Sequence, residues 1–179
     1  MHFYLTDAIF DLVQNSIEAN STFIVIDIVE KDSEYNIFIS DNGKGIEKDK
    51  LDKVFNPDIT EMEKHKNRKF GLGLSFIKHQ CELVDGKIEI DSIVGEGTSI
   101  HIQLPKNHPD TPPMGDIGSL VSEIFMLSDG CEIVFNRYIN NKKYELIKSK
   151  IVTNDIRWVK NLKEYINQFE TSFVEMEVK

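Results

Sequence analysis

Cysteine is scarce in this sequence, which has only Cys81 and Cys131 among its 179 residues. The two form no Cys-x-x-Cys pair, and no cluster of cysteine with histidine has the spacing of metal ligands. This absence argues against a cysteine-based metal site. Two isolated thiols are best interpreted as small buried hydrophobic side chains.

Long apolar runs are missing as well. No stretch approaches the roughly 18 apolar residues that a membrane span needs, and no basic segment followed by an apolar run marks a signal peptide near the N-terminus. The formal net charge is -9, so duplex DNA or an anionic membrane would meet net repulsion unless the basic run at 64–69 outweighed it locally. We therefore expect a cytoplasmic protein with neither a nucleic-acid nor a membrane partner.

Hydrophobic residues make up 40% of the chain, enough to form a core. Helical and alternating apolar spacing predicts elements in the order helix, two strands, loop, helix, two strands. The expected ranges are a helix over 5–19, strands over 22–28 and 35–40, a short helix over 47–54, a loop over 56–69, a helix over 74–84, and strands over 87–92 and 98–104. This order predicts an α/β two-layer sandwich, with a mixed β-sheet and helices on one face.

The C-terminal part begins after a proline-rich stretch, because four of the five prolines lie within 105–113. We interpret 106–114 as a linker between a domain at 1–105 and a small α+β segment at 115–179. The expected elements of that segment are a helix over 116–127, a hairpin of strands 132–138 and 144–151 turning at Asn140-Asn141, and a helix over 155–169 capped by Asn154. Its role is open between partner docking, dimerisation and a structural cover for the first domain.

Three segments carry chemistry, and the first is a polar row on the opening helix. Asp11, Asn15 and Glu18 are four and three residues apart, so they share one helical face. An asparagine oxygen suits Mg²⁺, which usually arrives with phosphates, and a nearby carboxylate could orient or deprotonate an attacking group. The alternative interpretation is the solvated polar face of an amphipathic helix.

The second segment is Ser-Asp-Asn-Gly-Lys-Gly-Ile at 40–46, directly after an apolar strand. The Asp41 carboxylate could accept a hydrogen bond from an exocyclic amino group such as that of adenine. Gly43 and Gly45 would let a flat base approach the backbone. A tight turn explains the same residues, because Asp-Asn-Gly is also turn chemistry.

The third segment is Lys-Phe-Gly-Leu-Gly-Leu-Ser at 69–75, just before a helix. Gly71 and Gly73 would expose N–H groups that bind phosphate together with the helix dipole, and basic residues at 64–69 would add positive charge. The pattern is neither a Walker A nor a Rossmann sequence. One glycine pair is a weak signal by itself.

Taken together and in this order, the motifs resemble the GHKL superfamily over about Leu5 to Pro105. That superfamily includes DNA gyrase, the ninety-kilodalton heat-shock chaperone, histidine kinases and the mismatch-repair protein MutL. Asp-x-Gly-x-Gly, Gly-Leu-Gly-Leu and Gly-x-Gly-Thr carry the resemblance, and Val-Phe-Asn-Pro at 54–57 is similar to the box that precedes the ATP lid of histidine kinases. The resemblance implies a Bergerat-type ATP-binding fold.

The resemblance also implies roles for matching residues. Asn15 would bind Mg²⁺, Asp41 would read the adenine amino group, Thr98 would place a hydroxyl near the base, and 56–70 would form a mobile lid. With ATP and Mg²⁺ as cofactors, the expected nucleotide contacts are Asn15, Asp41, Gly43, Gly45, Ile46, Lys69, Gly71, Leu72, Gly73, Leu74 and Thr98. Asp11 and Glu18 are the expected catalytic residues.

The sequence departs from the family in informative places. Asp11 stands where ATP-hydrolysing members carry a glutamate, and its shorter side chain reaches less far toward an attacking water. Glu18 stands where many histidine kinases carry a lysine or arginine, which replaces attraction for phosphate with repulsion unless Mg²⁺ or lid lysines compensate. Met1 lies only a few residues before the first helix, so we expect no built-in phosphoaccepting histidine domain.

Three functions are consistent with these residues. The preferred hypothesis is a stand-alone kinase or ATPase that transfers the γ-phosphate to a separate protein, because Asp11 keeps a carboxylate in the base position. The second is a non-catalytic module that senses ATP or ADP and docks on a regulatory partner. The third is a slow ATPase that forms a homodimer on binding ATP.

Overall fold

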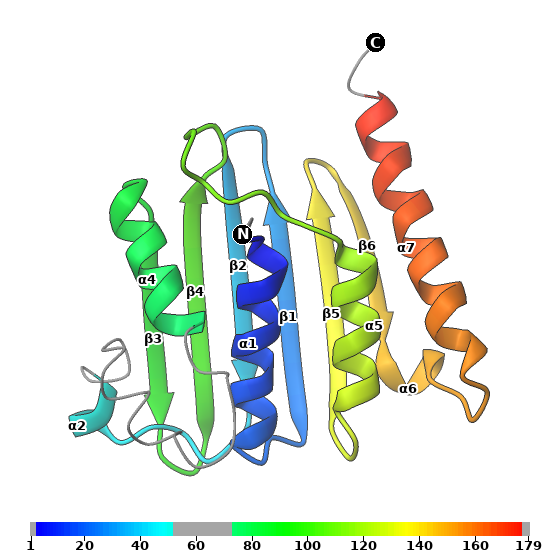
Figure 1. Ribbon diagram of the computed structural model, residues 1–179. Helices are drawn as coiled ribbons and strands as arrows, with labels where there is room; N and C mark the ends of the chain where they lie inside the picture. Colours follow the sequence, from blue (N-terminus) through cyan, green and yellow to red (C-terminus); the bar gives the residue numbers. More distant parts are fainter. Residues whose placement is uncertain (1–2, 52–72, 177–179) are drawn as a thin grey trace.

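A computed structural model describes residues 3–51 and 73–176 of the chain. Six strands form one mixed sheet in the order β3-β4-β2-β1-β5-β6 (Figure 1). Their bounds are β1 Phe23–Glu30, β2 Glu34–Asp41, β3 Lys87–Ile93, β4 Gly97–Pro105, β5 Glu132–Ile139 and β6 Lys142–Ile147. β1 and β5 are parallel, and the other neighbours are antiparallel.

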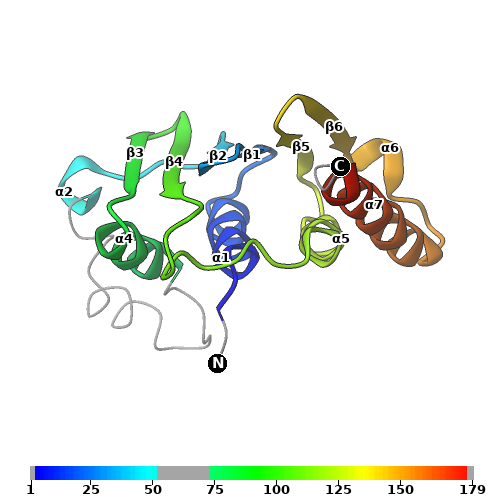
Figure 2. The same cartoon turned by 90° about the horizontal axis from the view of Figure 1, so that it is seen from above.

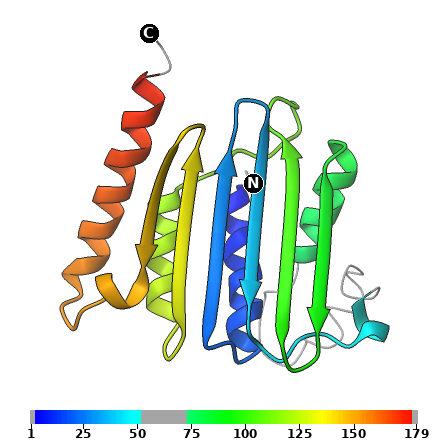
Figure 3. The same ribbon diagram turned by 180° about the vertical axis from the view of Figure 1, so that it is seen from behind.

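The helices cover one face of this sheet, as the view along the strands shows (Figure 2). α1, α4 and α5 lie side by side under the strands, and α7 packs next to α5. Their bounds are α1 Leu5–Glu18, α2 Lys48–Leu51, α4 Gly73–Leu83, α5 Ile117–Leu127, α6 Lys148–Ile151 and α7 Arg157–Met176. Seen from behind, the strands lie in front, and α1, α4 and α5 lie behind them (Figure 3). The predicted α/β sandwich with helices on one face of a mixed sheet is confirmed.

Strand alternation places the apolar side chains on the helix face. In β1, every second residue from Ile24 to Ile28 is fully buried, and Ile37 and Ile39 of β2 are buried beside them. Burying one such side chain stabilises the fold by roughly 1.5–3 kcal/mol. The period-two pattern in the sequence therefore predicts which face of the sheet packs against the core.

The proline-rich linker is bound to α1. The N–H groups of Leu5 and Thr6 donate to the carbonyl oxygens of Pro113 and Met114, each at 2.9 Å. The first turn of a helix has no internal acceptors for these donors, so the linker supplies them. The segment between β4 and α5 is consequently fixed at the start of the helix that carries Asp11.

The C-terminal segment shares the sheet and core of the first domain. Figure 1 shows β5 and β6 extending the sheet beyond β1. Ile133 and Phe135 of β5 are fully buried in the same cluster as Ile24 and Ile26. The strands on either side of the linker thus form one layer, a continuity that the sequence analysis did not predict.

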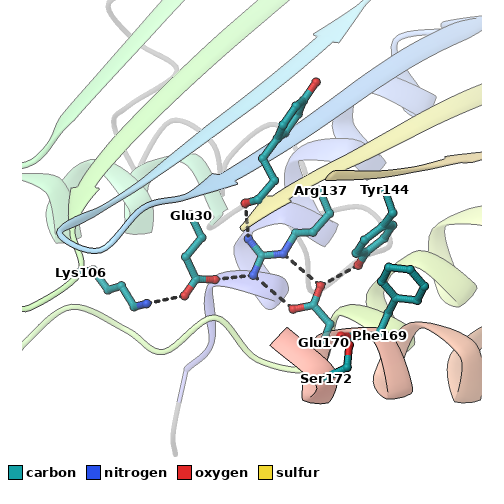
Figure 4. A network of polar contacts seen from close by, with 8 residues as sticks. Glu30, Lys106, Arg137, Tyr144, Phe169, Glu170 and Ser172 are labelled. Atoms are coloured by element: carbon teal, nitrogen blue, oxygen red, sulfur yellow. Dashed lines mark hydrogen bonds and ion pairs between the residues drawn. The ribbon is translucent and has the colours of Figure 1, made fainter. Parts of the chain in front are cut away.

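A buried ion network fastens this segment in place (Figure 4). The Arg137 side chain is only 2% exposed, and its guanidinium contacts the carboxylates of Glu30 and Glu170. Tyr144 donates to Glu170 Oε1 at 2.7 Å, and Lys106 Nζ lies 2.6 Å from Glu30 Oε1. The network therefore ties β1, β5, β6, the linker and α7 together.

Two predicted C-terminal elements differ from the structure. The second hairpin strand was expected to reach Ile151, but β6 ends at Ile147 and a helical turn, α6, follows. Lys148 donates to the carbonyls of Ser128 and Cys131 in the connection between α5 and β5, which holds the first residue of α6 against that connection. The last helix runs to Met176 rather than Phe169, and it is Asp155 that accepts the N–H of Arg157 at 3.0 Å, where Asn154 was the expected cap.

Candidate nucleotide-binding site

The isoleucine-rich core ends in a polar row at one end of the sheet. Ser92, Thr98 and Asp41 are direct cross-strand neighbours on β3, β4 and β2. One step further into the sheet, the corresponding row of β3, β4 and β2 is Ile90, Ile100 and Ile39. Because directly paired residues point to the same face, the polar row continues the helix-facing layer. A hydroxyl-and-carboxylate surface therefore borders the apolar core.

Asp41 is held by donors from α1 and from its own loop. Ser16 Oγ donates to Asp41 Oδ2 at 2.7 Å, and the N–H of Gly43 donates to Oδ1 at 2.8 Å. Ser21 Oγ is 3.2 Å from Oδ1 but only 2.6 Å from the carbonyl oxygen of Ser16. A hydroxyl has one proton, so Ser21 mainly binds the end of α1 and Ser16 orients the carboxylate.

Sequence reasoning missed both serines. The available signal was the burial stripe of α1, in which Ser16 follows Leu5, Ile9, Leu12 and Val13 at helical spacing. A serine in an apolar stripe needs a partner, because an unpaired buried hydroxyl is destabilising. That partner is Asp41.

The glycines after Asp41 allow close contact between two backbone segments. A Cβ at Gly43 would lie 2.6 Å from Ser21 Oγ and 2.9 Å from Ala19 Cβ. Gly45 has φ +69° and lies against the Ile93 backbone, where no side chain fits. The structure thus supplies a packing reason for both glycines, and their expected contact with a base stays a prediction.

The polar row of α1 faces the beginning of α4. A Cβ at Gly73 would lie 2.6 Å from Asp11 Cβ and 3.1 Å from Asp11 Oδ2. Asn15 lies one helical turn further along α1 and is half-buried, and Glu18 lies one turn beyond it and is exposed. The structure therefore brings Asp11 next to the first turn of the helix whose N–H groups were expected to bind phosphate.

The predicted contacts converge from four elements. Asn15 comes from α1, Asp41 and Ile46 from the end of β2 and its loop, Thr98 from β4, and Leu74 from the start of α4. The Ile46 N–H donates to Ser92 Oγ at 2.8 Å, which ties the loop to β3. Lys69, Gly71, Leu72 and the expected lid at 56–70 lie outside the described residues.

The family model of the histidine kinase-, DNA gyrase B-, and HSP90-like ATPases matches residues 3–108, which is more than half of the sequence. The chain belongs to this family. The resemblance seen in the glycine and aspartate motifs is confirmed, and the domain is an ATP-binding domain of the kinase-like GHKL type.

Several sensor kinases are similar to this domain. The sensor histidine kinase ZraS of Escherichia coli K12 is 34% identical over 113 residues, which cover 62% of this chain and 23% of that protein. The autoinducer 2 sensor kinase/phosphatase LuxQ of Vibrio parahaemolyticus is 33% identical over 111 residues, or 56% of this chain and 13% of LuxQ. The sensor protein kinase WalK of Staphylococcus haemolyticus is 41% identical over 83 residues, or 43% and 14%. The chain thus spans less than a quarter of the length of these curated relatives.

The donor set of this GHKL domain fits a phosphate-borne cation. Among residues 3–51 and 73–176, no group of three or more histidine, cysteine or acidic side chains could hold a metal ion by itself. Mg²⁺ commonly binds through one or two protein oxygens together with substrate phosphates, and the half-buried Asn15 is the residue that would supply such an oxygen.

Two other expectations concern cysteines and membranes. Cys81 and Cys131 are free and buried, and burial raises the pKa of the Cys81 thiol to about 11, which keeps it protonated and unreactive. Within the part of the chain that the structure describes, no helix has the length and hydropathy of a membrane span.

Proposed function

We propose that this domain binds Mg-ATP and transfers the γ-phosphate to a side chain of a separate protein. The observation that carries the proposal is the position of Asp11, whose carboxylate lies beside the first turn of α4 and on the same helical face as Asn15. A base and a cation ligand are then presented together to a phosphate bound at the α4 N-terminus.

Each part of the nucleotide would meet a suitable group. Asp41 would accept from the adenine amino group, and the N–H groups at the start of α4 would bind phosphate oxygens. Asn15 would hold Mg²⁺, which when bound neutralises charge on the phosphates. Lysines of the expected lid, which includes Lys69, would add further positive charge.

The proposed reaction is a direct displacement at the γ-phosphorus. The acceptor hydroxyl or imidazole forms a new bond to phosphorus, the bond to the β,γ-bridging oxygen breaks, and ADP leaves with that electron pair. Asp11 would receive the proton of the acceptor group. Phosphoryl transfer depends mainly on positioning and charge neutralisation, which these side chains can supply.

A second candidate function is nucleotide sensing without transfer. Glu18 bears on it, because this exposed carboxylate lies on the same face of α1 two turns after Asp11 and would repel a γ-phosphate, which disfavours its transfer. Binding would then act through a partner that recognises the nucleotide-bound domain. A slow ATPase that dimerises on ATP is the third arrangement.

One labelling experiment separates these functions. The full chain is incubated with γ-labelled ATP and Mg²⁺, alone and with candidate partner proteins, beside an Asp11→Asn variant that keeps the side-chain shape. Transfer of label to a partner, lost in Asp11→Asn, is the expected result. Free phosphate from the chain alone would favour the slow ATPase, and retention of intact ATP would favour the sensor. The full chain is required because α5, β5, β6 and α7 contribute buried residues to the same core.

A further inference from the structure

Ser92 connects three segments at the polar end of the sheet. Its hydroxyl accepts the N–H of Ile46 at 2.8 Å, from the loop after β2. The same oxygen lies 3.0 Å from the carbonyl oxygen of Gly97 and 2.9 Å from Thr98 Oγ1, both at the start of β4. Ser92 thus contacts the residue that pairs directly with Asp41.

The number of protons on these hydroxyls limits their arrangement. Ser92 carries one hydroxyl proton. If it donates to the Gly97 carbonyl, Thr98 must donate to Ser92, and all three contacts of the Ser92 oxygen are hydrogen bonds. If Ser92 donates to Thr98 instead, the Gly97 carbonyl loses this donor. The first arrangement satisfies more groups and is therefore favoured.

This arrangement fixes what Thr98 can offer to a ligand. Its proton is used toward Ser92, so only lone pairs remain on Thr98 Oγ1. The neighbouring Asp41 carboxylate is also an acceptor, with Ser16 and the Gly43 N–H already bound to it. The two side chains together present acceptors only, which suits an amino group with two N–H bonds.

We infer that Ser92 is a positioning residue that makes the site select 6-amino over 6-oxo purine nucleotides. It acts by holding Thr98 as an acceptor, so that the oxygen of a 6-oxo purine would face two acceptors and no donor. The inference rests on the proposed binding of ATP at this end of the sheet, and it assigns the base selectivity to a residue that contacts no ligand itself.

The test compares the dissociation constants of ATP and inosine triphosphate by calorimetry on the full chain. The two bases differ in the group at the 6-position, amino or oxo, and in the proton that N1 of the 6-oxo base carries. The wild-type protein should prefer ATP. Ser92→Ala frees the Thr98 hydroxyl to turn and donate to the 6-oxo group, so the preference should fall about tenfold, the equivalent of one hydrogen bond. Ser92→Thr keeps the hydroxyl and should retain the preference.

The matched control is Ser99→Ala. Ser99 Oγ pairs with Ser40 Oγ at 2.9 Å on the opposite face of the same strands, so its loss should leave the preference unchanged. Thr98→Val removes the hydroxyl through which Ser92 acts. In the Thr98→Val background, Ser92→Ala should therefore have no further effect on the preference, which a purely structural role of Ser92 would not produce.

The outcomes are distinct. A folded Ser92→Ala variant with the wild-type preference overturns the inference. If Ser92→Ala does not fold, Thr98→Val decides, since an unchanged preference in that variant would show that Thr98 does not read the base. Wild-type protein that binds neither nucleotide contradicts the proposed function itself, whereas equal binding of both nucleotides contradicts only the selectivity.

Discussion

The two ends of the central strands are built from different chemistry. Where β2 ends, Asp41 contacts hydroxyls and a glycine N–H, and on α1 the carboxylate of Asp11 lies near the N-terminus of α4. Ile24 of β1 pairs with Asp41, and six residues further along β1, Glu30 contacts the buried guanidinium of Arg137 at the other end of the sheet. One end carries carboxylates and hydroxyls where a ligand is expected, and the other pairs its charges with opposite charges inside the protein.

This difference leads us to expect that the Asp41 end serves nucleotide recognition and that the Arg137 end stabilises the fold. At the Arg137 end each charge has an opposite charge in contact, so changes there should mainly affect folding. At the Asp41 end the groups are held in place by small donors, so changes there should mainly affect nucleotide binding. The predictions below test this distinction, and the change expected to matter most comes first.

Arg137→Ala should lower the free energy of unfolding by about 3–5 kcal/mol, because it removes the buried guanidinium that neutralises Glu170 and leaves Glu30 with Lys106 alone. Urea unfolding monitored by circular dichroism measures the change. Arg157→Ala is the control, since that arginine pairs with Asp155 on the exposed surface and its loss should change the stability far less. Equal losses in both variants would show that the buried network does not fasten the C-terminal segment.

Asp41→Ala should weaken ATP binding at least about tenfold, because a hydrogen bond to a charged group contributes on the order of 1.5–3 kcal/mol. Calorimetry measures the affinity, and unfolding should change much less than in Arg137→Ala. Asp91→Ala is the matched control, an exposed carboxylate on β3 that pairs with Ser99 on the other face. Unchanged affinity in Asp41→Ala would show that Asp41 does not bind the adenine base.

Asn15→Ala should remove the dependence of ATP binding on Mg²⁺, because the amide oxygen is the expected protein ligand of the cation. Binding of ATP is measured in Mg²⁺ and in excess chelator, and the two affinities should become similar. Asn107→Ala, an exposed linker residue, should keep the wild-type difference. A wild-type response to Mg²⁺ in Asn15→Ala would assign the metal to another group.

Lowering the pH should reduce the contribution of the ion network around Arg137 to the stability of the fold. Burial alone would raise the pKa of Glu30, but hydrogen bonds from Lys106 and Arg137 outweigh burial and hold the pKa below its ordinary value of 4.5. A lowered pKa stabilises the fold above the ordinary value, and this contribution disappears as the pH falls through the lowered pKa.

Unfolding free energies measured between pH 6 and pH 3 therefore test the Glu30 contribution. The wild-type protein should lose stability below about pH 4.5, and Glu30→Gln should show a shallower loss because it has no carboxylate to titrate. Glu89→Gln, an exposed carboxylate on β3, should follow the wild-type curve. Parallel curves for wild type and Glu30→Gln would show that Glu30 does not contribute to the loss of stability at low pH.

Much of the architecture could be predicted because local patterns carry it. The alternating isoleucines of β1, β2 and β4 identified strands and their buried face, and the stripe from Leu5 to Val13 identified α1. The motif residues Asp41 and Gly73 could be found for the same reason, since each lies at the end of a strongly patterned element. Their roles as nucleotide contacts remain predictions.

Other features depend on contacts between residues far apart in the sequence. Asp27 and Asn136 hydrogen-bond at 2.8 Å, yet 109 positions separate them. The same holds for Arg137 with Glu30, a pair whose strand position alone would favour an apolar side chain. A charged residue at a core position gives no local hint of the partner that neutralises it.

The elements, the buried face of each strand and the GHKL motifs can be predicted from the sequence, because they follow from side-chain periodicity and short-range turn chemistry. The pairing of β5 with β1, the hydrogen bonds of Ser16 and Ser92 at the polar end and the ion pairs of Arg137 at the other end become visible only in the folded protein. The physical reason is that strand pairing and hydroxyl direction depend on which distant backbones come within hydrogen-bonding distance, and local sequence does not encode that distance.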